Sequence, residues 1–594
     1  MKYKKLAELY ESLSSTPKRL EKTDILSKFL ADVTEEDKEI LYLLLGEIYP
    51  EYSEKKIGIS NQLAIQAISK STGIEKDKVV KEWKSIGDLG KVAEKLTKEK
   101  KQSTLQSHIN HEPNSKESLI KRNFGSLYLT TEKVLENLRK LPELEGKGTV
   151  NKKLALITEL LASASPVEAL YLTRTLIGDL RIGVQESTIR DAMAKAFFDG
   201  EKETIDKIQR ALDRTNDLSL VFEMAKTKKL DKLEEVHLEV GKPIKVMLAQ
   251  KAKSIKEGFE MVGKPCAIEY KYDGFRLLIH KKGKEVILFT RRLENVTKQF
   301  PEVIEYLNKY VKGNSFILDS EAVGYNKKTK EYQSFQQISQ RIRRKYDIAK
   351  LQEELPIEIN VFDILYYNGK SQIDEPYEKR AKLIREIVKN QPYKIISSKR
   401  IITDDEDKAE KFYEQALKNN QEGIMMKNLQ AVYQPGRRVG HMIKIKPGEK
   451  DLDLVITGAE YGAGKRSGWM SSFILSCRGD KNGEFLEIGK MGTGIKEKEN
   501  VSNADSTGMS FNELTEKLKP LIISEKGKSV KIKPKIVVSV TYQEIQRSPN
   551  YNSGWALRFP RFTSLRPDKP LSEIASLKEI EKDFANQKRN WKYG

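Results

Sequence analysis

Glu269-Tyr-Lys-Tyr-Asp-Gly-Phe-Arg276 is the stretch from which the organisation of this chain can be worked out. Residues that alternate along a β-strand share one face of the sheet, so Glu269, Lys271 and Asp273 are expected to point the same way. Gly274 would then allow a turn or a close approach to the backbone. A lysine between two carboxylates is either part of a salt-bridged surface strand or a poised nucleophile. The stretch alone does not decide between the two.

Length and composition restrict the class of protein. The chain has 594 residues, of which 38% are hydrophobic and 32% are charged, and this predicts several packed domains instead of a disordered chain. No apolar run of about 18 residues is present and no apolar signal follows Met1, so neither a membrane span nor export is expected. Two cysteines, Cys266 and Cys477, exclude a four-cysteine zinc module and a disulfide framework, and they fit a reducing cytoplasm.

The charge balance is strongly basic. The formal net charge is +21 and the isoelectric point is near 9.3. Such a balance indicates a polyanionic partner such as nucleic acid, or it reflects a lysine-rich surface that is simply solvated. Composition leaves both interpretations open.

The first 235 residues have the spacing of helices. Ser165-Pro-Val-Glu168 has the N-cap, first-turn proline and glutamate of a capping box, and the helix that follows is expected to stop at Gly183. Thr34-Glu-Glu-Asp37 predicts a second helix start. The charged and Ser/Asn-rich segment from Lys98 to Glu117 is expected to be an exposed loop.

From about residue 240 the hydrophobic period changes to that of strands. Strands are predicted at residues 266–272, 277–281, 286–291, 315–325, 357–367, 423–427 and 441–446, with helices at 376–389 and 405–419. This pattern indicates a mixed α+β domain. After Pro447-Gly448, strands at 453–460, 472–477, 484–491 and 535–543 indicate a small barrel of about five strands, and residues 571–591 indicate a final helix.

Further chemically distinctive residues follow Lys271 in a fixed order. Glu321 interrupts the apolar strand Phe316–Val323, where a buried acid would need a cation, a sugar hydroxyl or a ligand. The others are Arg276, Arg291, Phe362, Glu422, Lys444, Lys446, Arg558, Arg561 and Lys569. Each has an ordinary explanation when taken alone, because a lysine beside acids is usually a surface ion pair and a strand phenylalanine usually lies in a core.

The ordered set resembles the nucleotidyltransferases that adenylylate a lysine. Together with the helical N-terminal region it is similar to the ATP-dependent DNA ligases of the archaeal and eukaryotic replicative type, and the resemblance covers essentially the whole chain. It implies an all-α DNA-binding domain at 1–235, an α+β adenylation domain at 236–447, and a C-terminal OB-fold β-barrel with a terminal helix at 448–594.

The resemblance also implies a role for each residue of the set. Lys271 would be the catalytic nucleophile that carries AMP. Nucleotide contacts are implied for Glu269, Arg276, Arg291, Glu321, Phe362, Arg438, Lys444 and Lys446. Glu321 and Glu422 would hold Mg²⁺, or Mn²⁺ in its place. Arg558, Arg561 and Lys569 would orient pyrophosphate, and Arg174, Arg181 and Arg190 would contact DNA.

The implied activity is the sealing of 5′-phosphate/3′-hydroxyl nicks in duplex DNA, with ATP as cofactor, in replication, repair and recombination. A monomer associated with the nucleoid in the cytoplasm is expected. The segment Gln102–Ile109 resembles a degenerate sliding-clamp peptide, and a plain polar loop is its alternative.

Other proteins share parts of this residue pattern. RNA ligases and mRNA-capping enzymes share the lysine chemistry, but they do not normally carry about 235 residues of helical domain. An NAD-dependent ligase is disfavoured, because its zinc cluster cannot be built from two cysteines. A catalytically dead DNA-binding scaffold would have no need of Lys271, Glu321, Glu422, Lys444 and Lys446. The choice among ATP, ADP and GTP as nucleotide donor stays open.

Overall fold

The computed structural model forms two compact units. One consists of Met1–Ala252, Gly258–Asp404 and Met425–Lys444, and the other of Lys253–Glu257, Asp405–Ile424 and Ile445–Gly594. The residues described are 1–594 without 54, 109–127, 147, 235, 334, 345, 437, 448–449, 463–465, 467, 482, 498–508 and 594. The division into three domains at 235 and 447 stays a prediction.

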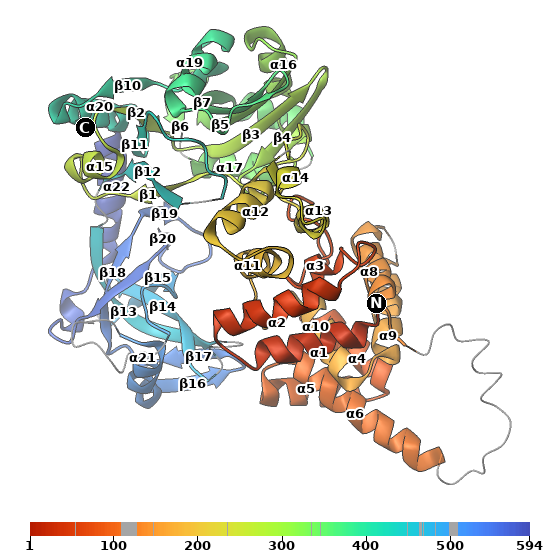
Figure 1. The fold of residues 1–594 in the computed structure, drawn as a ribbon. Helices are drawn as coiled ribbons and strands as arrows, with labels where there is room; N and C mark the ends of the chain where they lie inside the picture. The colour runs from red at the N-terminus through yellow and green to blue at the C-terminus, as the bar shows by residue number, and fades with distance from the viewer. Residues whose placement is uncertain are drawn as a thin grey trace. The chain divides into compact units, whose positions relative to one another are not determined.

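The N-terminal region is helical, as predicted (Figure 1). Its helices are α1 (Tyr3–Ser14), α2 (Arg19–Asp32), α3 (Ile40–Leu43), α4 (Asn61–Thr72), α5 (Lys76–Ile86), α6 (Leu89–His108), α8 (Thr131–Lys140), α9 (Thr149–Ser163), α10 (Pro166–Leu176), α11 (Glu186–Phe197), α12 (Lys202–Thr215), α13 (Leu218–Lys226) and α14 (Leu230–Glu234). One continuous hydrophobic core runs from Tyr3 to Val236 and includes the buried rings of Tyr10, Tyr171 and Phe222.

The capping box at the start of α10 is confirmed. The Ser165 hydroxyl accepts a hydrogen bond from the Glu168 amide at 3.4 Å, and the Glu168 carboxylate accepts one from the Ser165 amide at 2.7 Å. The predicted end at Gly183 is wrong, because α10 already ends at Leu176. Gly178, Arg181 and Gly183 then adopt positive φ angles, which a right-handed helix cannot contain.

The predicted loop between Lys98 and Glu117 is also wrong over its first part. Helix α6 continues to His108, because buried Leu89, Val92 and Leu96 anchor it and the Lys, Glu and Gln residues beyond them are good helix formers. Within the clamp-like segment, Gln102–His108 is therefore helical backbone, and Ile109 lies outside the described residues.

The central part of the chain is a mixture of helices and strands, as predicted, and its strands form two sheets. One has the order β1 (Leu248–Lys251), β12 (Arg438–Ile445), β11 (Gly423–Asn428), β2 (Cys266–Lys271), β10 (Arg400–Thr403). The other has the order β4 (Glu285–Thr290), β3 (Phe275–Lys282), β5 (Ser315–Tyr325), β7 (Ile357–Tyr367), β8 (Lys370–Ser371), with β6 (Tyr332–Gln333) on β5 and β9 (Ile395–Ser397) on β7. The helices of this part are α15 (Ile255–Val262), α16 (Pro301–Tyr310), α17 (Phe335–Arg343), α18 (Ile348–Glu354), α19 (Tyr377–Ile387) and α20 (Glu406–Lys418).

Alternation along β3 explains how the second sheet is covered on both faces. Leu277 and Ile279 belong to a core with Phe300, Leu307 and residues of α19. Leu278, between them, belongs to a different core together with Met442 of β12, a strand of the first sheet. Because successive side chains point to opposite faces, one face of the sheet packs on helices and the other on the first sheet.

The turn that joins β2 to β3 differs from the sequence expectation. β2 ends at Lys271, so Asp273 lies in the turn and does not continue the strand face shared by Glu269 and Lys271. A Cβ atom on Gly274 would lie 2.2 Å from the carbonyl oxygen of Ala322 on β5. Gly274 is therefore required because two backbones approach closely.

Replacing Gly274 by alanine is expected to lower the free energy of unfolding by about 1–3 kcal/mol, because the new methyl group cannot avoid the backbone of β5. Gly440→Ala is the matched control, since its Cβ would meet no atom closer than 4.0 Å. Denaturant unfolding of both variants checks the prediction, and equal midpoints would contradict it.

The C-terminal unit is rich in strands, as predicted. A seven-stranded sheet contains β13 (Lys450–Tyr461), β14 (Met470–Arg478), β15 (Phe485–Met491), β16 (Ile522–Lys526), β17 (Ser529–Ile532), β18 (Val537–Tyr542) and β21 (Arg561–Leu565), and β19 (Glu544–Arg547) pairs with β20 (Trp555–Arg558). The Phe562 amide donates to the Thr493 carbonyl at 2.9 Å, which joins β21 to the segment after β15. The sheet thus curls back on itself, as a barrel requires.

Sequence reasoning found fewer strands here than exist. β16, β17, β19, β20 and β21 were missed because they have only four or five residues each and are largely half-exposed. The unit also contains α21 (Phe511–Leu518) and α22 (Leu577–Tyr593), which begins six residues later than the predicted helix. Among the helices described, none is both long and apolar enough to cross a bilayer.

Candidate active site

Lys271 is the last residue of β2, a strand that lies between β11 and β10 in the first sheet. Glu269 and Tyr270 before it are buried, whereas Lys271 is partly exposed. The chain then turns through Asp273 into β3. Because the rest of β2 is buried, the backbone of Lys271 is held in place, while the side chain of Lys271 remains partly exposed to solvent.

Glu269 of this strand forms a buried group with two side chains of neighbouring elements, Lys427 and Tyr377. Lys427 of β11 places its ammonium 2.7 Å from Glu269 Oε2. The hydroxyl of Tyr377 on α19 donates to the other carboxylate oxygen, Oε1. Burial first, and then the neighbouring Glu269 charge, raise the pKa of Tyr377 well above its usual value, so the hydroxyl keeps its proton. Both oxygens of Glu269 therefore accept hydrogen bonds from buried donors.

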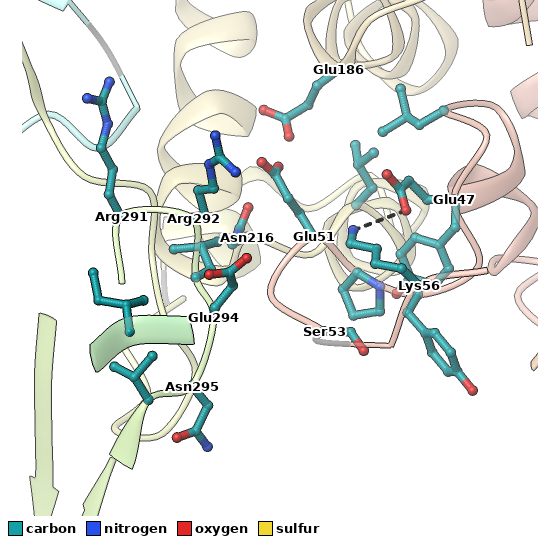
Figure 2. A pocket seen from close by; sticks show the side chains of 18 of the residues that line it. Glu47, Glu51, Ser53, Lys56, Glu186, Asn216, Arg291, Arg292, Glu294 and Asn295 are labelled. Carbon is teal, nitrogen blue, oxygen red and sulfur yellow. Dashed lines mark hydrogen bonds and ion pairs between the residues drawn. The ribbon is translucent and has the colours of Figure 1, made fainter. Parts of the chain in front are cut away.

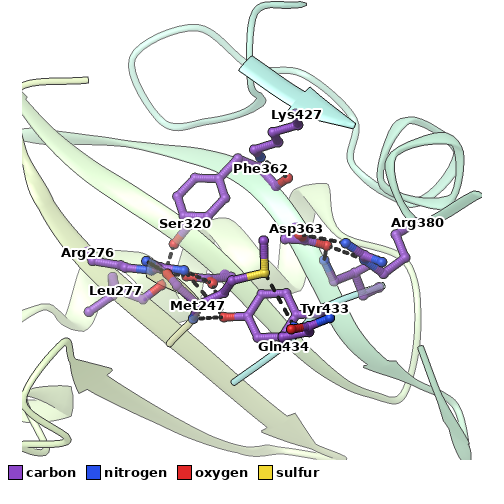
Figure 3. A network of polar contacts seen from close by, with 12 residues as sticks. Met247, Arg276, Leu277, Ser320, Phe362, Asp363, Arg380, Lys427, Tyr433 and Gln434 are labelled. Carbon is purple, nitrogen blue, oxygen red and sulfur yellow. Dashed lines mark hydrogen bonds and ion pairs between the residues drawn. The ribbon is translucent and has the colours of Figure 1, made fainter. Parts of the chain in front are cut away.

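Phe362 occupies an exceptional position on β7. It is the one residue between Ile357 and Leu365 that is not buried, so it is not simply a core residue. The Arg276 guanidinium lies 5.2 Å and the Lys427 ammonium 4.9 Å from its ring centroid, within the range of cation–π contacts. In the view of Figure 3 the ring lies between these two cations. Lys427 also donates to the Phe362 carbonyl at 3.3 Å.

Arg276 is held by a network that sequence reasoning missed (Figure 3). Asp319 accepts from its Nε at 2.8 Å and its Nη2 at 2.5 Å, and the Met247 carbonyl accepts from Nη1 at 2.8 Å. Tyr433 adds a hydrogen bond to Asp319 Oδ2 at 2.8 Å. The guanidinium expected to grip a nucleotide is thus also a structural ion-pair partner. The available signal was the acid at 319 inside an apolar strand.

A second buried ion pair lies next to this network. Asp363, which follows Phe362, accepts from Arg380 Nε at 2.7 Å and Nη2 at 3.2 Å. Both side chains are almost completely buried. Phe362, Tyr377, Lys427, Arg276 and Tyr433 are among the residues that line a cavity of about 10 Å³. That volume is about what one water molecule occupies.

The other predicted nucleotide and metal residues are placed as follows. Glu321 of β5 lies opposite Arg276 on β3. Glu422 forms an ion pair with Lys446, and the Lys444 carbonyl accepts from the Ala252 amide at 3.1 Å. Arg438 begins β12 opposite Leu248. Among the described residues, no three acidic, histidine or cysteine side chains gather as a ready-made metal cluster.

Arg291 lies apart from the Arg276 network, in a cavity of about 990 Å³ (Figure 2). Its lining contains Arg291 and Arg292 together with acidic residues of the helical region, among them Glu51 and Glu186. Lys56 forms an ion pair with Glu47 at 3.2 Å in this lining. The structure therefore does not bring Arg291 together with the residues around Phe362.

The three helical arginines differ in accessibility. Arg174 is buried, with Nη2 2.7 Å from Asp88 Oδ2, and its contact with DNA stays a prediction. Arg181 reaches the same oxygen at 2.9 Å and remains partly exposed. Burial raises the pKa of Asp88, but the two arginines outweigh it and hold the pKa below its usual value. Arg190 contacts Asp191 and Gln209.

The C-terminal residues of the set lie in the second unit. Arg558 of β20 forms an ion pair with Glu544 of β19 at 2.7 Å. Lys569 lies 3.8 Å from Asp453 and 3.7 Å from Glu573. Arg561 is exposed on β21. All three cations lie at or near the surface, where an anion could compete for the two that are paired.

Comparison with known proteins identifies the family. Residues 2–194 match the DNA ligase N terminus, residues 246–446 the ATP dependent DNA ligase domain, and residues 466–569 the ATP dependent DNA ligase C terminal region. A DNA ligase of Nanoarchaeum equitans is 43% identical over 99% of both chains, and one of Thermococcus onnurineus is 38% identical over 99% of both chains.

A solved structure named Pmar-Lig_PreS3 covers 94% of this chain and 99% of its own, with a TM-score of 0.55 and 17% identity, and it shows the shared fold. The relatives are similar along their full length, and the three family regions occur in the order expected from the sequence. The chain therefore belongs to the ATP-dependent DNA ligases of archaeal type.

Proposed function

We propose that Lys271 accepts AMP from ATP and that the chain uses this adduct to seal 5′-phosphate/3′-hydroxyl nicks in duplex DNA, in replication and repair. As a member of its family the chain uses ATP and acts on DNA. The observation that carries the proposal is the position of Lys271. It ends a buried strand next to the Glu269–Lys427–Phe362 group, partly exposed, where an amine can meet a nucleotide.

The first step forms a bond between the Lys271 nitrogen and the α-phosphorus of ATP and breaks the bond to pyrophosphate, which leaves. A lysine amine is protonated at neutral pH, so a proton must pass to solvent or to a neighbouring base before attack. In this proposal Lys444 and Lys446 hold the α-phosphate, since lysine suits phosphate as a point charge. Phe362 stacks on the adenine, and Glu321 contacts the ribose.

In the second step AMP passes from Lys271 to the 5′-phosphate at the nick, which makes AMP the leaving group. In the third step the adjacent 3′-hydroxyl attacks that phosphate and AMP departs. The covalent intermediate divides one difficult reaction into easier ones. In this proposal Arg558, Arg561 and Lys569 orient pyrophosphate in the first step.

The residues proposed to hold a divalent cation fit Mg²⁺ better than a metal that needs a protein cage. Mg²⁺ is usually bound by one or two carboxylates together with substrate phosphates and water, so the lack of a three-residue cluster among the described residues does not oppose it. Glu321 would hold the ion, and Glu422 could join it after releasing Lys446. The ion would neutralise triphosphate charge.

Contacts to DNA are proposed for the accessible helical arginines, Arg181 and Arg190. Such contacts reach the phosphate backbone, which suits an enzyme that acts at any sequence, and they weaken with salt. Clamp binding through Gln102–Ile109, a monomeric state, and a nucleoid-associated location stay predictions.

A sealing assay tests the proposed function. With a labelled nicked duplex and Mg²⁺, ATP is expected to support sealing. Chelation of the metal with EDTA is expected to lower the rate by at least about 100-fold, with recovery on adding Mg²⁺ or Mn²⁺. Parallel reactions with ADP, GTP and a nicked RNA duplex provide the comparison. Equal sealing of RNA, or undiminished sealing in EDTA, would contradict the proposal.

A further inference from the structure

We propose that Lys427 is a positioning residue that sets base specificity, because it keeps the buried Glu269 carboxylate ionised so that this carboxylate selects an amine at C6 of the purine. The inference rests on the proposed function. It deepens that function by assigning the preference for ATP to the side chains of Glu269 and Lys427. Lys427 has no role in the mechanism described above.

The geometry supports this assignment. Glu269 Oε2 and Lys427 Nζ are 2.7 Å apart, and the two side chains are only 4% and 6% exposed. The same ammonium donates to the Phe362 carbonyl at 3.3 Å and lies 4.9 Å from the Phe362 ring centroid. Lys427 therefore contacts both Phe362, which is proposed to stack on the base, and Glu269, which is proposed to contact the edge of the base.

The chemistry follows from the protonation state of Glu269. An ionised carboxylate only accepts hydrogen bonds, and its two oxygens offer about four lone-pair sites. The buried donors Lys427 and Tyr377 use part of this capacity, which leaves room for one more donor. The C6 amine of adenine is such a donor, whereas the C6 carbonyl of guanine or hypoxanthine would bring an acceptor against an acceptor.

Removal of the Lys427 ammonium would favour the protonated form of Glu269. A buried carboxylate without a cation binds a proton more readily, because burial penalises its charged form. A protonated Glu269 could donate to a C6 carbonyl, and discrimination would fall. The charged and titratable groups near Glu269 include Lys427 on β11, Tyr377 on α19, Arg400 opposite it on β10, Lys271 on the same face of β2, and Tyr272 after β2. Lys427 is the cation that the described contacts place at hydrogen-bonding distance from the carboxylate.

The test compares ATP with ITP, which carries a carbonyl in place of the C6 amine. Single-turnover formation of the protein-bound nucleotide is measured from pH 6 to pH 9 for wild type, Lys427→Gln and Lys427→Arg. Wild type is expected to keep one selectivity throughout. Lys427→Gln is expected to lose about tenfold in selectivity at pH 6 and to regain part of it toward pH 9, as the carboxyl ionises. Lys427→Arg, which retains the charge, is expected to stay near wild type.

A second variant avoids removing a buried charge. Tyr377→Phe deletes only the hydroxyl that donates to Glu269, and it is expected to raise KM for ATP about three- to tenfold with a smaller change in kcat. Tyr332→Phe is the matched control, because Tyr332 donates to another buried carboxylate, Glu358, at 2.7 Å outside the proposed site. Its adenylylation kinetics are expected to be unchanged.

Sealing of a nick that already carries AMP shows whether each variant is folded, since that reaction omits the nucleotide step. If Lys427→Gln keeps the wild-type ATP-to-ITP ratio at every pH, Lys427 is merely structural and the inference is overturned. If wild type itself forms no adduct with ATP, the proposed function fails instead. The two failures are therefore distinguishable.

Discussion

Replacing Lys271 by alanine is expected to abolish the protein-bound AMP adduct and to lower ATP-dependent sealing by on the order of 10⁴-fold, because the methyl group of alanine cannot attack the α-phosphorus. Labelled ATP followed by denaturing electrophoresis measures the adduct. Sealing of a nick that already carries AMP is expected to survive in part, since that reaction does not need the nucleophile.

The matched control for this variant is Lys282→Ala. Lys282 is the last residue of β3 and is exposed, so it shares with Lys271 a place at a strand end but has no role in the proposed mechanism. Its adduct formation is expected to equal that of wild type. Formation of an acid-labile AMP adduct by Lys271→Ala would refute the assignment of the nucleophile, whatever happens to overall sealing.

Replacing Asp319 by asparagine is expected to lower the free energy of unfolding by about 3–5 kcal/mol. Asp319 is completely buried and accepts two hydrogen bonds from Arg276 and one from Tyr433. The amide has nearly the same shape as the carboxylate but no charge, so the variant leaves the Arg276 guanidinium, which is only 15% exposed, without its partner's negative charge. Denaturant unfolding followed by tyrosine and tryptophan fluorescence measures the loss.

The control for Asp319→Asn is Asp32→Asn. Asp32 forms an ion pair with Lys5 at 3.2 Å, but both side chains are at least half exposed. Solvent screens such a pair, so the change in the free energy of unfolding is expected to stay within about 0.5 kcal/mol. Similar losses in the two variants would show that burial does not govern the Asp319 ion pair. An Asp319 variant as stable as wild type would contradict the prediction directly.

The longer elements could be predicted from the sequence because their signals are local. β5 and β7 were predicted with their observed bounds, Ser315–Tyr325 and Ile357–Tyr367, since each is a long apolar run bounded by turn residues. The start of α10 at Ser165-Pro166 was predicted for the same reason, because a cap needs only neighbouring residues. The short strands β16, β17, β19, β20 and β21 of the C-terminal unit carry too few residues for a periodic signal.

The end of α6 shows the opposite error. The polar residues after Lys98 have the composition of a loop, but they continue a helix that is anchored by apolar residues before them. A polar composition indicates that a segment is exposed to solvent. It does not indicate whether a helix that begins before the segment continues into it.

The candidate site was predicted only in part. Lys271, Glu321, Glu422 and Phe362 were selected because a lysine, acids and a ring recur in a family order. Asp319, Tyr433, Arg380 and the Lys427 contact with Glu269 were not selected. Their partners are far away in the chain; Lys427 and Glu269, for example, are 158 positions apart. A pair of this kind leaves no local pattern.

The sequence alone determined the family, the order of the helical and strand-rich regions, and the identity of the proposed nucleophile, because each depends on which residues follow one another. Only the tertiary structure decided what surrounds that nucleophile. It showed that Asp273 leaves the strand, that Arg174 is buried and paired with Asp88, and that Glu269 is paired with Lys427. The physical reason is that burial and ion pairing depend on which distant segments of the chain pack together. A sequence pattern contains information only about residues that are close together in the chain.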